Sequence, residues 1–149
     1  MKEAIFELEF TMPVLANGTG SSDEKDTFQK DAAGALIFHQ SWFFSAFSKA
    51  IGYAKAKSVK PGDISMDLIV HAPVSPFRRK YGEDQYRTHE AIMPGTTVKF
   101  EAMVADHITE SVLKEILDKM GKYVGISPFG HSLGFGRFNV VSVKVEPGA

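Results

Sequence analysis

The chain has 149 residues, of which 44% are hydrophobic and 23% are charged, a composition typical of a globular domain with one hydrophobic core. Its formal net charge of −1 gives no general attraction to nucleic acid or anionic membrane, so either contact requires a local basic patch. The absence of cysteine excludes disulfides, thiolate metal sites and cysteine nucleophiles.

The N-terminal sequence, MKEAIFELEF, mixes glutamates with apolar residues and lacks the apolar core of a signal peptide. No run in the chain approaches the roughly 20 apolar residues of a membrane span. We therefore expect a cytoplasmic protein without a membrane partner.

The first predicted element is a strand over residues 4–12, where apolar and polar side chains alternate. Its expected buried side chains are Phe6, Leu8, Phe10 and Met12. Residues 17–34 are polar and rich in Gly, Ser and Asp, which predicts a long loop.

A helix is predicted over residues 41–53, after a short extended piece at residues 35–38. Ser41 is the expected N-cap of this helix. Its aromatic residues cover more than one helical face, which indicates burial on a second side and favours a subunit interface. These residues are Trp42, Phe43, Phe44 and Phe47.

Three strands and a second helix follow. Alternating apolar residues predict strands over residues 64–70 and 97–104, and the run RFNVVSVKV predicts a strand over residues 137–145. Thr109 is the expected N-cap of the second helix, which carries an apolar stripe. Residues 73–95 break the periodicity and form an insertion.

The order strand, helix, strand, strand, helix, strand is the split βαβ, or ferredoxin-like, arrangement. We predict an α+β fold in a single domain over residues 1–149, with a four-stranded antiparallel sheet and two helices on one of its faces. Long insertions are expected after strand 1 and between strands 2 and 3. The insertions, another chain or a ligand would cover the other face of the sheet.

Five of the 13 glycines lie between positions 121 and 136, after the second helix and before the last strand. Glycine lets another backbone approach closely, and successive N–H groups can surround an anion. Hydroxyl, imidazole and guanidinium groups in the same segment suit a phosphodiester backbone with unstacked bases. The expected contact residues are Gly125, Ser127, His131, Ser132, Gly134, Gly136 and Arg137.

A purely structural interpretation of this glycine loop stays open. Gly121 also suits helix packing, Gly125 a helix C-cap, and the later glycines a simple connection. The segment is not a dinucleotide-binding motif, because it follows a helix and precedes a strand.

The insertion contains FRRKYGEDQYRTH at residues 77–89, in which basic and aromatic side chains alternate with one another. This mixture suits phosphate contact and base stacking by a projecting finger. The alternative is a solvated loop that Glu83 and Asp84 partly neutralise. The expected contact residues are Arg78, Arg79, Lys80, Tyr81 and Arg87.

The five histidines show no metal-ligand spacing, and the sequence contains no carboxylate cluster, so we predict neither a metal nor another cofactor. Cleavage of RNA without metal needs a general base and a cation near the phosphate. His131 and Arg137 are the pair that suits these roles, but the sequence does not assign them as catalytic.

The helix ending in KMGKYVGI, the glycine-rich turn and the strand GFGRFNV resemble the C-terminal signature of the RAMP superfamily, the repeat-associated proteins of CRISPR systems. They are especially similar to small, mostly uncharacterised bacteriophage proteins. The resemblance implies a ferredoxin-like core whose glycine loop contacts RNA or single-stranded nucleic acid. The residues that match the signature are Gly125, Gly134, Gly136, Arg137 and Phe138.

The first functional hypothesis is therefore a binder of RNA or single-stranded DNA that acts in an oligomeric or filamentous assembly. The alternative is a structural or protein-interaction module of phage origin, which would act in the host cytoplasm. A small metal-independent endoribonuclease is the third hypothesis. Typical RNA-processing RAMP proteins carry two ferredoxin-like units, whereas 149 residues accommodate one.

Overall fold

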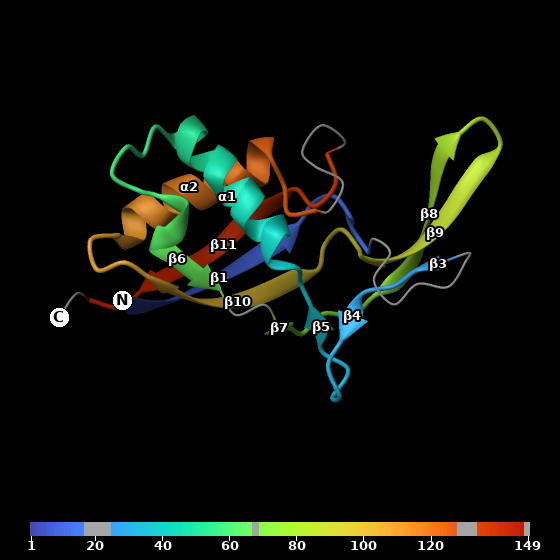
Figure 1. The fold of residues 1–149 in the computed structure, drawn as a ribbon, viewed down its shortest axis with the longest axis horizontal. Coiled ribbons are helices and arrows are strands. Elements are labelled where there is room, and N and C mark those ends of the chain that lie inside the picture. Colours follow the sequence, from blue (N-terminus) through green and yellow to red (C-terminus); the bar gives the residue numbers. More distant parts are fainter. Residues whose placement is uncertain (17–24, 67–68, 128–133, 148–149) are drawn as a thin grey trace.

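Four antiparallel strands form the main sheet, in the order β11-β1-β10-β6 (Figure 1). The computed structural model describes residues 1–16, 25–66, 69–127 and 134–147. The strands are β1 (Lys2–Phe10), β6 (Ile64–Met66), β10 (Thr97–Val104) and β11 (Phe138–Val145). The helices α1 (Gln40–Ala54) and α2 (Glu110–Tyr123) lie on the same face of this sheet. The predicted α+β class, with two helices on a four-stranded antiparallel sheet, is confirmed for these elements.

The alternating pattern of the first strand is correct up to Phe10. Phe6 and Phe10 are buried, and Phe6 stacks on Phe100, its register partner in β10, with ring centroids 5.5 Å apart. Met12 was predicted to be buried, but it lies beyond the strand and is 40% exposed. The alternation stops because the N–H groups of Thr11 and Met12 both donate to the Arg137 carbonyl, at 2.9 and 3.3 Å.

The two helix starts are capped differently. Thr109 caps α2 as predicted, since its hydroxyl accepts from the Val112 N–H at 3.2 Å. The prediction of Ser41 as the cap of α1 is wrong. His39 is the N-cap, because its Nδ1 accepts from the Ser41 N–H at 3.2 Å and the helix begins at Gln40.

The aromatic side of α1 packs inside this chain. Trp42 contacts Phe38 and Phe28 of the first insertion, with ring centroids 5.4 and 6.2 Å apart. Phe43 and Phe47 are buried against the core. At Trp42 the second side of the helix is therefore covered by the chain itself, and these aromatics no longer favour a subunit interface there.

The two insertions pair with each other, which sequence periodicity did not predict. From the first come β2 (Val14–Leu15), β3 (Lys25–Asp26), β4 (Gln29–Lys30) and β5 (Leu36–Ile37). The second insertion of the structure lies between β6 and β10. From it come β7 (Ile69–Val70), β8 (Ser75–Gly82) and β9 (Gln85–Ile92). β2 and β3 both pair with β9, and β5 pairs with β7. Two small sheets therefore form beside the main sheet.

Two predictions need correction here. Residues 25–30 are part of the predicted loop, yet they carry β3 and β4, and Phe28 is buried. The strand predicted over residues 64–70 is divided between β6 in the main sheet and β7 in a small sheet. A single turn of 3-10 helix, η1 (Pro61–Asp63), precedes β6. Neither helix of the described part of the chain is long and apolar enough to cross a bilayer.

The β8–β9 hairpin projects away from the helices and the main sheet (Figure 1), and polar contacts along β9 attach it to the first insertion. Asp26 of β3 is 4% exposed and accepts two hydrogen bonds from Arg87 of β9, at 2.6 and 2.7 Å. Glu90 of β9 accepts from Lys30 at 2.6 Å and from the Phe28 N–H at 2.9 Å. Strand pairing and these ion pairs together fix the hairpin to the first insertion.

We predict that Asp26→Asn lowers the free energy of unfolding by about 2 kcal/mol, because it breaks a bidentate ion pair that is partly buried. Urea denaturation measures this loss, and hydrogen exchange in β9 reports whether the hairpin loosens. The control is Asp118→Asn, which breaks the exposed pair with Lys114 and is expected to cost less than about 0.5 kcal/mol. Equal losses in the two variants would contradict the role of Asp26.

Candidate nucleic-acid interface

The basic residues of the hairpin lie on two opposite faces. Arg78 is paired with Thr88 and Lys80 with Tyr86, so these side chains share one face. Arg79 is paired with Arg87 and therefore lies on the other. The sequence predicted one basic finger, but strand alternation divides its cations into two groups with different surroundings.

The outer face carries the exposed cations. Arg78 and Lys80 are exposed, and the guanidinium carbon of Arg78 lies 4.0 Å from the ring centroid of Tyr86. A guanidinium at this distance from an aromatic ring makes a cation–π contact, which orients its flat surface. The side chain of Tyr81, also predicted as a contact, is not among those that the structure describes. This face can offer charge to phosphates and a flat cationic surface to bases.

The inner face is a polar network. The Arg79 Nε donates to His89 Nε2 at 3.2 Å, so His89 accepts at this nitrogen and carries its proton on Nδ1. That Nδ1 lies 2.7 Å from the Ala16 carbonyl and 3.2 Å from Asp26. Arg87 is paired with the same carboxylate. Arg79 and Arg87, both predicted as contacts, therefore take part in positioning the hairpin.

Two of the predicted glycines hold the chain against itself. Gly125 and Gly136 have φ values of 85° and 75°, and a Cβ at Gly136 would overlap the Ile126 carbonyl oxygen. The N–H groups of Gly125 and Gly136 donate to the carbonyls of Met120 and Pro13, at 2.7 and 2.8 Å. These N–H groups are already engaged, so the anion-binding role expected of the loop falls to other groups.

The remaining loop residues differ in exposure. Gly134 has a φ of 76° and open space around its Cβ position, so another backbone can approach it. Ser127 is 9% exposed and has a partner within the protein. His131 and Ser132 lie outside the described residues, as does the tip of the loop.

An aromatic contact joins the hairpin to the glycine loop. Phe77 of β8 and Phe135 of the loop meet edge to face, with ring centroids 6.0 Å apart. These two residues lie 58 positions apart in the sequence, and each region was predicted from its own composition. The structure brings the base of the hairpin and the end of the loop together.

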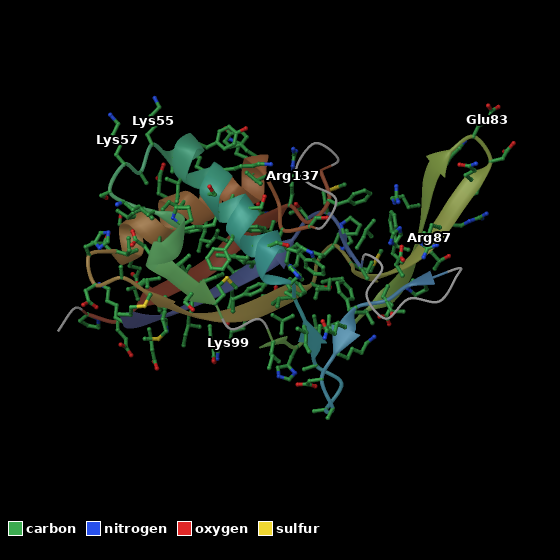
Figure 2. All side chains as sticks on the ribbon, viewed as in Figure 1. Lys55, Lys57, Glu83, Arg87, Lys99 and Arg137 are labelled. Atoms are coloured by element: carbon green, nitrogen blue, oxygen red, sulfur yellow. The ribbon has the colours of Figure 1, made fainter. Side chains whose placement is uncertain are left out.

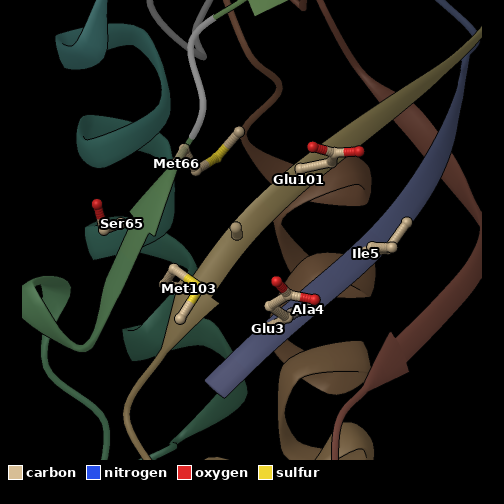
Figure 3. A pocket seen from close by; sticks show the side chains of 8 residues that line it. Glu3, Ala4, Ile5, Ser65, Met66, Glu101 and Met103 are labelled. Carbon is tan, nitrogen blue, oxygen red and sulfur yellow. The ribbon is translucent and has the colours of Figure 1, made fainter. Parts of the chain in front are cut away.

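The face of the main sheet that the helices leave open is acidic (Figure 3). A cavity of about 390 Å³ lies there, with Glu3 and Glu101 beside the apolar side chains of Ile5, Met66 and Met103. A hydrogen-bonded contact with Glu146, and repulsion from it and from Glu101, raise the pKa of Glu3 above its usual value. Such a face repels phosphates, so the nucleic-acid interface is better sought at the hairpin and the glycine loop.

Neither a protein-family model nor a curated protein matches the sequence. Among solved structures, the fold is similar to a chain in the cryo-EM structure of the Type III-B Cmr-beta bound to cognate target RNA. The TM-score is 0.62 at 16% sequence identity, and the similarity covers 99% of this chain. It covers 61% of the other chain, so this chain spans about three fifths of the length of the one it matches.

This likeness concerns the fold, and it extends over the two insertions as well as the main sheet. It gives no support to a relation with bacteriophage proteins. The described residues contain no group of three or more His, Asp or Glu side chains arranged to hold a metal ion. The endoribonuclease hypothesis depends on His131, which the structure does not describe.

Sequence analysis missed the residues that fix the hairpin, Asp26 and His89, and it treated Tyr86 only as a neighbour of the basic patch. A signal for the hairpin was present. Gly82, Glu83 and Asp84 separate two runs of β-forming residues, and Asp84 adopts a φ of 56° in the turn. No comparable signal exists for Asp26, because its partners lie about 60 residues away.

We predict that Gly136→Ala lowers the free energy of unfolding by about 2 to 4 kcal/mol, because it adds a backbone clash to an unfavourable φ. Gly52→Ala is the control: it lies within α1 with open space around its Cβ position, and should stabilise the chain by about 0.5 to 1 kcal/mol. Thermal and urea denaturation measure both. A Gly136→Ala variant with unchanged free energy of unfolding would mean that the close approach of Gly136 to the Ile126 carbonyl does not constrain the loop.

Proposed function

We propose that this chain is an RNA-binding subunit of a larger assembly, with a RAMP-like ferredoxin core. The order β11-β1-β10-β6 supports that core, because it places the fourth, first, third and second core strands side by side. One helix follows the first of these strands and the other follows the third. The similar fold in the Cmr-beta structure bound to target RNA supports RNA as the ligand.

The observation that carries the proposal is the contact between Phe77 and Phe135. It brings the base of the hairpin and the end of the loop together, with Phe77 on the same face of the hairpin as Arg79 and opposite the exposed Arg78 and Lys80. Without this contact, a basic finger and a glycine loop would be two weak and separate indications. With it, the two regions adjoin, and a single strand bound by Arg78 and Lys80 on the outer face would pass over an edge of the hairpin to reach Gly134.

The proposed contacts follow from the surroundings of each side chain. Lys80 supplies charge to a phosphate, and the Arg78 guanidinium, held over Tyr86, offers a flat surface on which a base can stack. Gly134 accepts the close approach of a strand. Tyr81, His131, Ser132 and Arg137 remain proposed contacts, whereas Arg79, Arg87, Gly125, Ser127 and Gly136 are proposed to position them.

We predict that replacing Arg78 and Lys80 together by alanine weakens binding of a single-stranded RNA. The slope of log affinity against log salt should fall in magnitude by about 0.7, because the phosphate contact of Lys80 is lost, and the loss of stacking on Arg78 should weaken binding at every salt concentration. Fluorescence anisotropy with a labelled 12-nucleotide RNA, measured at several salt concentrations, tests this. A DNA of the same sequence serves as a parallel probe and should bind more weakly.

The matched control for this pair is Lys55→Ala with Lys57→Ala. These lysines are exposed at the end of α1, on the side of the molecule away from the hairpin (Figure 2). The two alanine substitutions remove the same charge as the hairpin pair. An equal loss of RNA affinity in both double variants would therefore show that only the net charge of the protein matters. In that case the hairpin is not the RNA interface.

A second candidate function is the docking of a basic protein partner on the open face of the main sheet. The face carries more carboxylates than ammonium groups by register: Glu3, Glu7, Glu9 and Glu101 against Lys99 and Lys144. Exposed apolar side chains, such as Met103, lie among them. A segment with lysines spaced by apolar residues complements both features.

We predict that a Lys-Leu-Lys-Leu-Lys peptide binds this face at neutral pH and that Glu3→Gln with Glu101→Gln weakens the binding. Because the pKa of Glu3 is raised, this carboxylate becomes neutral sooner as the pH falls, so peptide affinity should decrease on acidification. Calorimetric titration measures both effects. The control, Glu83→Gln with Glu115→Gln, removes two carboxylates elsewhere. An equal effect of this control would exclude the sheet face.

A further inference from the structure

A second cavity, of about 470 Å³, lies between the C-terminal half of α2 and the start of β11. Its lining includes Thr11, Asp118, Gly121, Lys122, Arg137 and Asn139. Gly121 allows the helix to reach the strand here, because a Cβ at this position would overlap the Phe138 carbonyl oxygen. The cavity therefore lies at a backbone contact, which limits how far its walls can move.

Arg137 is the residue of this cavity whose hydrogen bonding is incomplete. Its Nε is shielded from solvent and has no hydrogen-bond partner among the described residues. Buried donors of charged groups are normally paired, and leaving one unpaired costs free energy. Arg137 lines the cavity, so a turn of its side chain toward an acceptor there would pair the Nε, which is shielded in the present rotamer.

The backbone on both sides of this side chain is held firmly. The Arg137 carbonyl accepts from the N–H groups of Thr11 and Met12, at 2.9 and 3.3 Å. The N–H of the preceding Gly136 donates to the Pro13 carbonyl at 2.8 Å. The backbone of Arg137 therefore has a fixed position, and binding an acceptor would require only its side chain to reorient.

The charges around the cavity favour an anion as that acceptor. Lys122 adds a second cation next to Arg137, and its ammonium lies 5.3 Å from the ring centroid of Tyr123. The one carboxylate in the lining, Asp118, is paired with Lys114 at 3.2 Å. The C-terminal end of α2 carries partial negative charge, which two cations outweigh. The Thr11 hydroxyl and the Asn139 amide are neutral donors.

The geometry of the donors favours phosphate over other anions. A guanidinium offers parallel N–H groups to two oxygens of one phosphate, and an ammonium can approach a third. The cavity is also close in sequence to the end of the glycine loop, since Arg137 is two residues after Phe135, which contacts Phe77 on the hairpin.

We propose that this cavity is a phosphate-binding subsite in which the Arg137 Nε is the central donor and Lys122 and Thr11 assist. That a strand supplies the phosphate rests on the proposed function. Free phosphate and the terminal phosphate of a strand share the same chemistry, and the experiment separates these sources. Lys122 and Thr11 thereby join the interface, although neither was predicted from the sequence.

The test observes the Arg137 Nε–H directly by ¹H–¹⁵N NMR of the full chain. The probes are inorganic phosphate, chloride at the same ionic strength, and one 12-nucleotide RNA with and without a 5′-phosphate. We expect the Nε–H resonance to shift and its hydrogen exchange to slow with inorganic phosphate and not with chloride. A shift with both RNAs identifies an internal phosphodiester, and a shift only with the phosphorylated RNA identifies the strand end.

Lys122→Ala is the test variant, because Lys122 is exposed and its loss should leave the fold intact. It should weaken phosphate binding and reduce the salt slope for RNA by about 0.7, the value for one phosphate contact on a single strand. Lys119→Ala is the control on the same helix. Lys119 lies outside the lining of the cavity, so its loss should leave the Arg137 response to phosphate unchanged.

The outcomes distinguish this subsite from the proposed function. If RNA binds but the Arg137 resonance responds to no probe, the subsite is refuted and RNA binding stands. If inorganic phosphate shifts the resonance but neither RNA binds, the subsite is supported and the proposed function fails. Equal effects of Lys122→Ala and Lys119→Ala on the Arg137 response would also refute the subsite.

Discussion

The carboxylate of Asp26 connects the two insertions of this chain. It pairs with Arg87 at 2.6 Å and lies 3.2 Å from His89, and both partners belong to β9 of the hairpin. A carboxylate that is almost fully buried requires such partners, since an unpaired charge in that position is costly. The direction of the hairpin depends on this requirement. The same hairpin carries Phe77, which contacts Phe135 of the glycine loop.

The cations of the hairpin consequently fall into a group bound within the fold and a group exposed to solvent. Arg87 neutralises Asp26 and Arg79 donates to His89, so these two are committed to the fold, although each has further contacts. Arg78 and Lys80 point to the opposite face and are exposed. A net charge of −1 therefore conceals a separation of charge, with cations on the outer face of the hairpin and carboxylates on the open face of the sheet.

The glycine loop combines a structural constraint with a candidate site. At its base, Gly125 and Gly136 let the end of α2 pass close to the start of β11. This crossing fixes the backbone of Arg137, whose Nε has no partner among the residues that the structure describes, and whose side chain lines a cavity with a second cation. The two roles weighed for the loop, packing and binding, are thus divided among neighbouring residues. The glycines provide the constraint, and the proposed donors are the residues beside them.

The sequence by itself determined the core of this protein. Period-two alternation placed β1 and β10, and helical spacing with Thr109 as the cap placed α2, because these signals are local and the chain carries them in consecutive residues. It also indicated both regions of the candidate site, from composition alone. Alternation failed at Met12, where two N–H groups turn toward the Arg137 carbonyl.

Only the tertiary structure decided how the insertions are used. The pairing of β3 with β9 and the burial of Asp26 depend on partners about 60 residues away, and no local pattern encodes such a contact. The same holds for the division of the basic patch and for the cavity beside Arg137. Burial, ion pairing and cavities depend on contacts between segments that are distant in the sequence. The free energies of these contacts exist only in the folded chain, so a local pattern of residues does not indicate them.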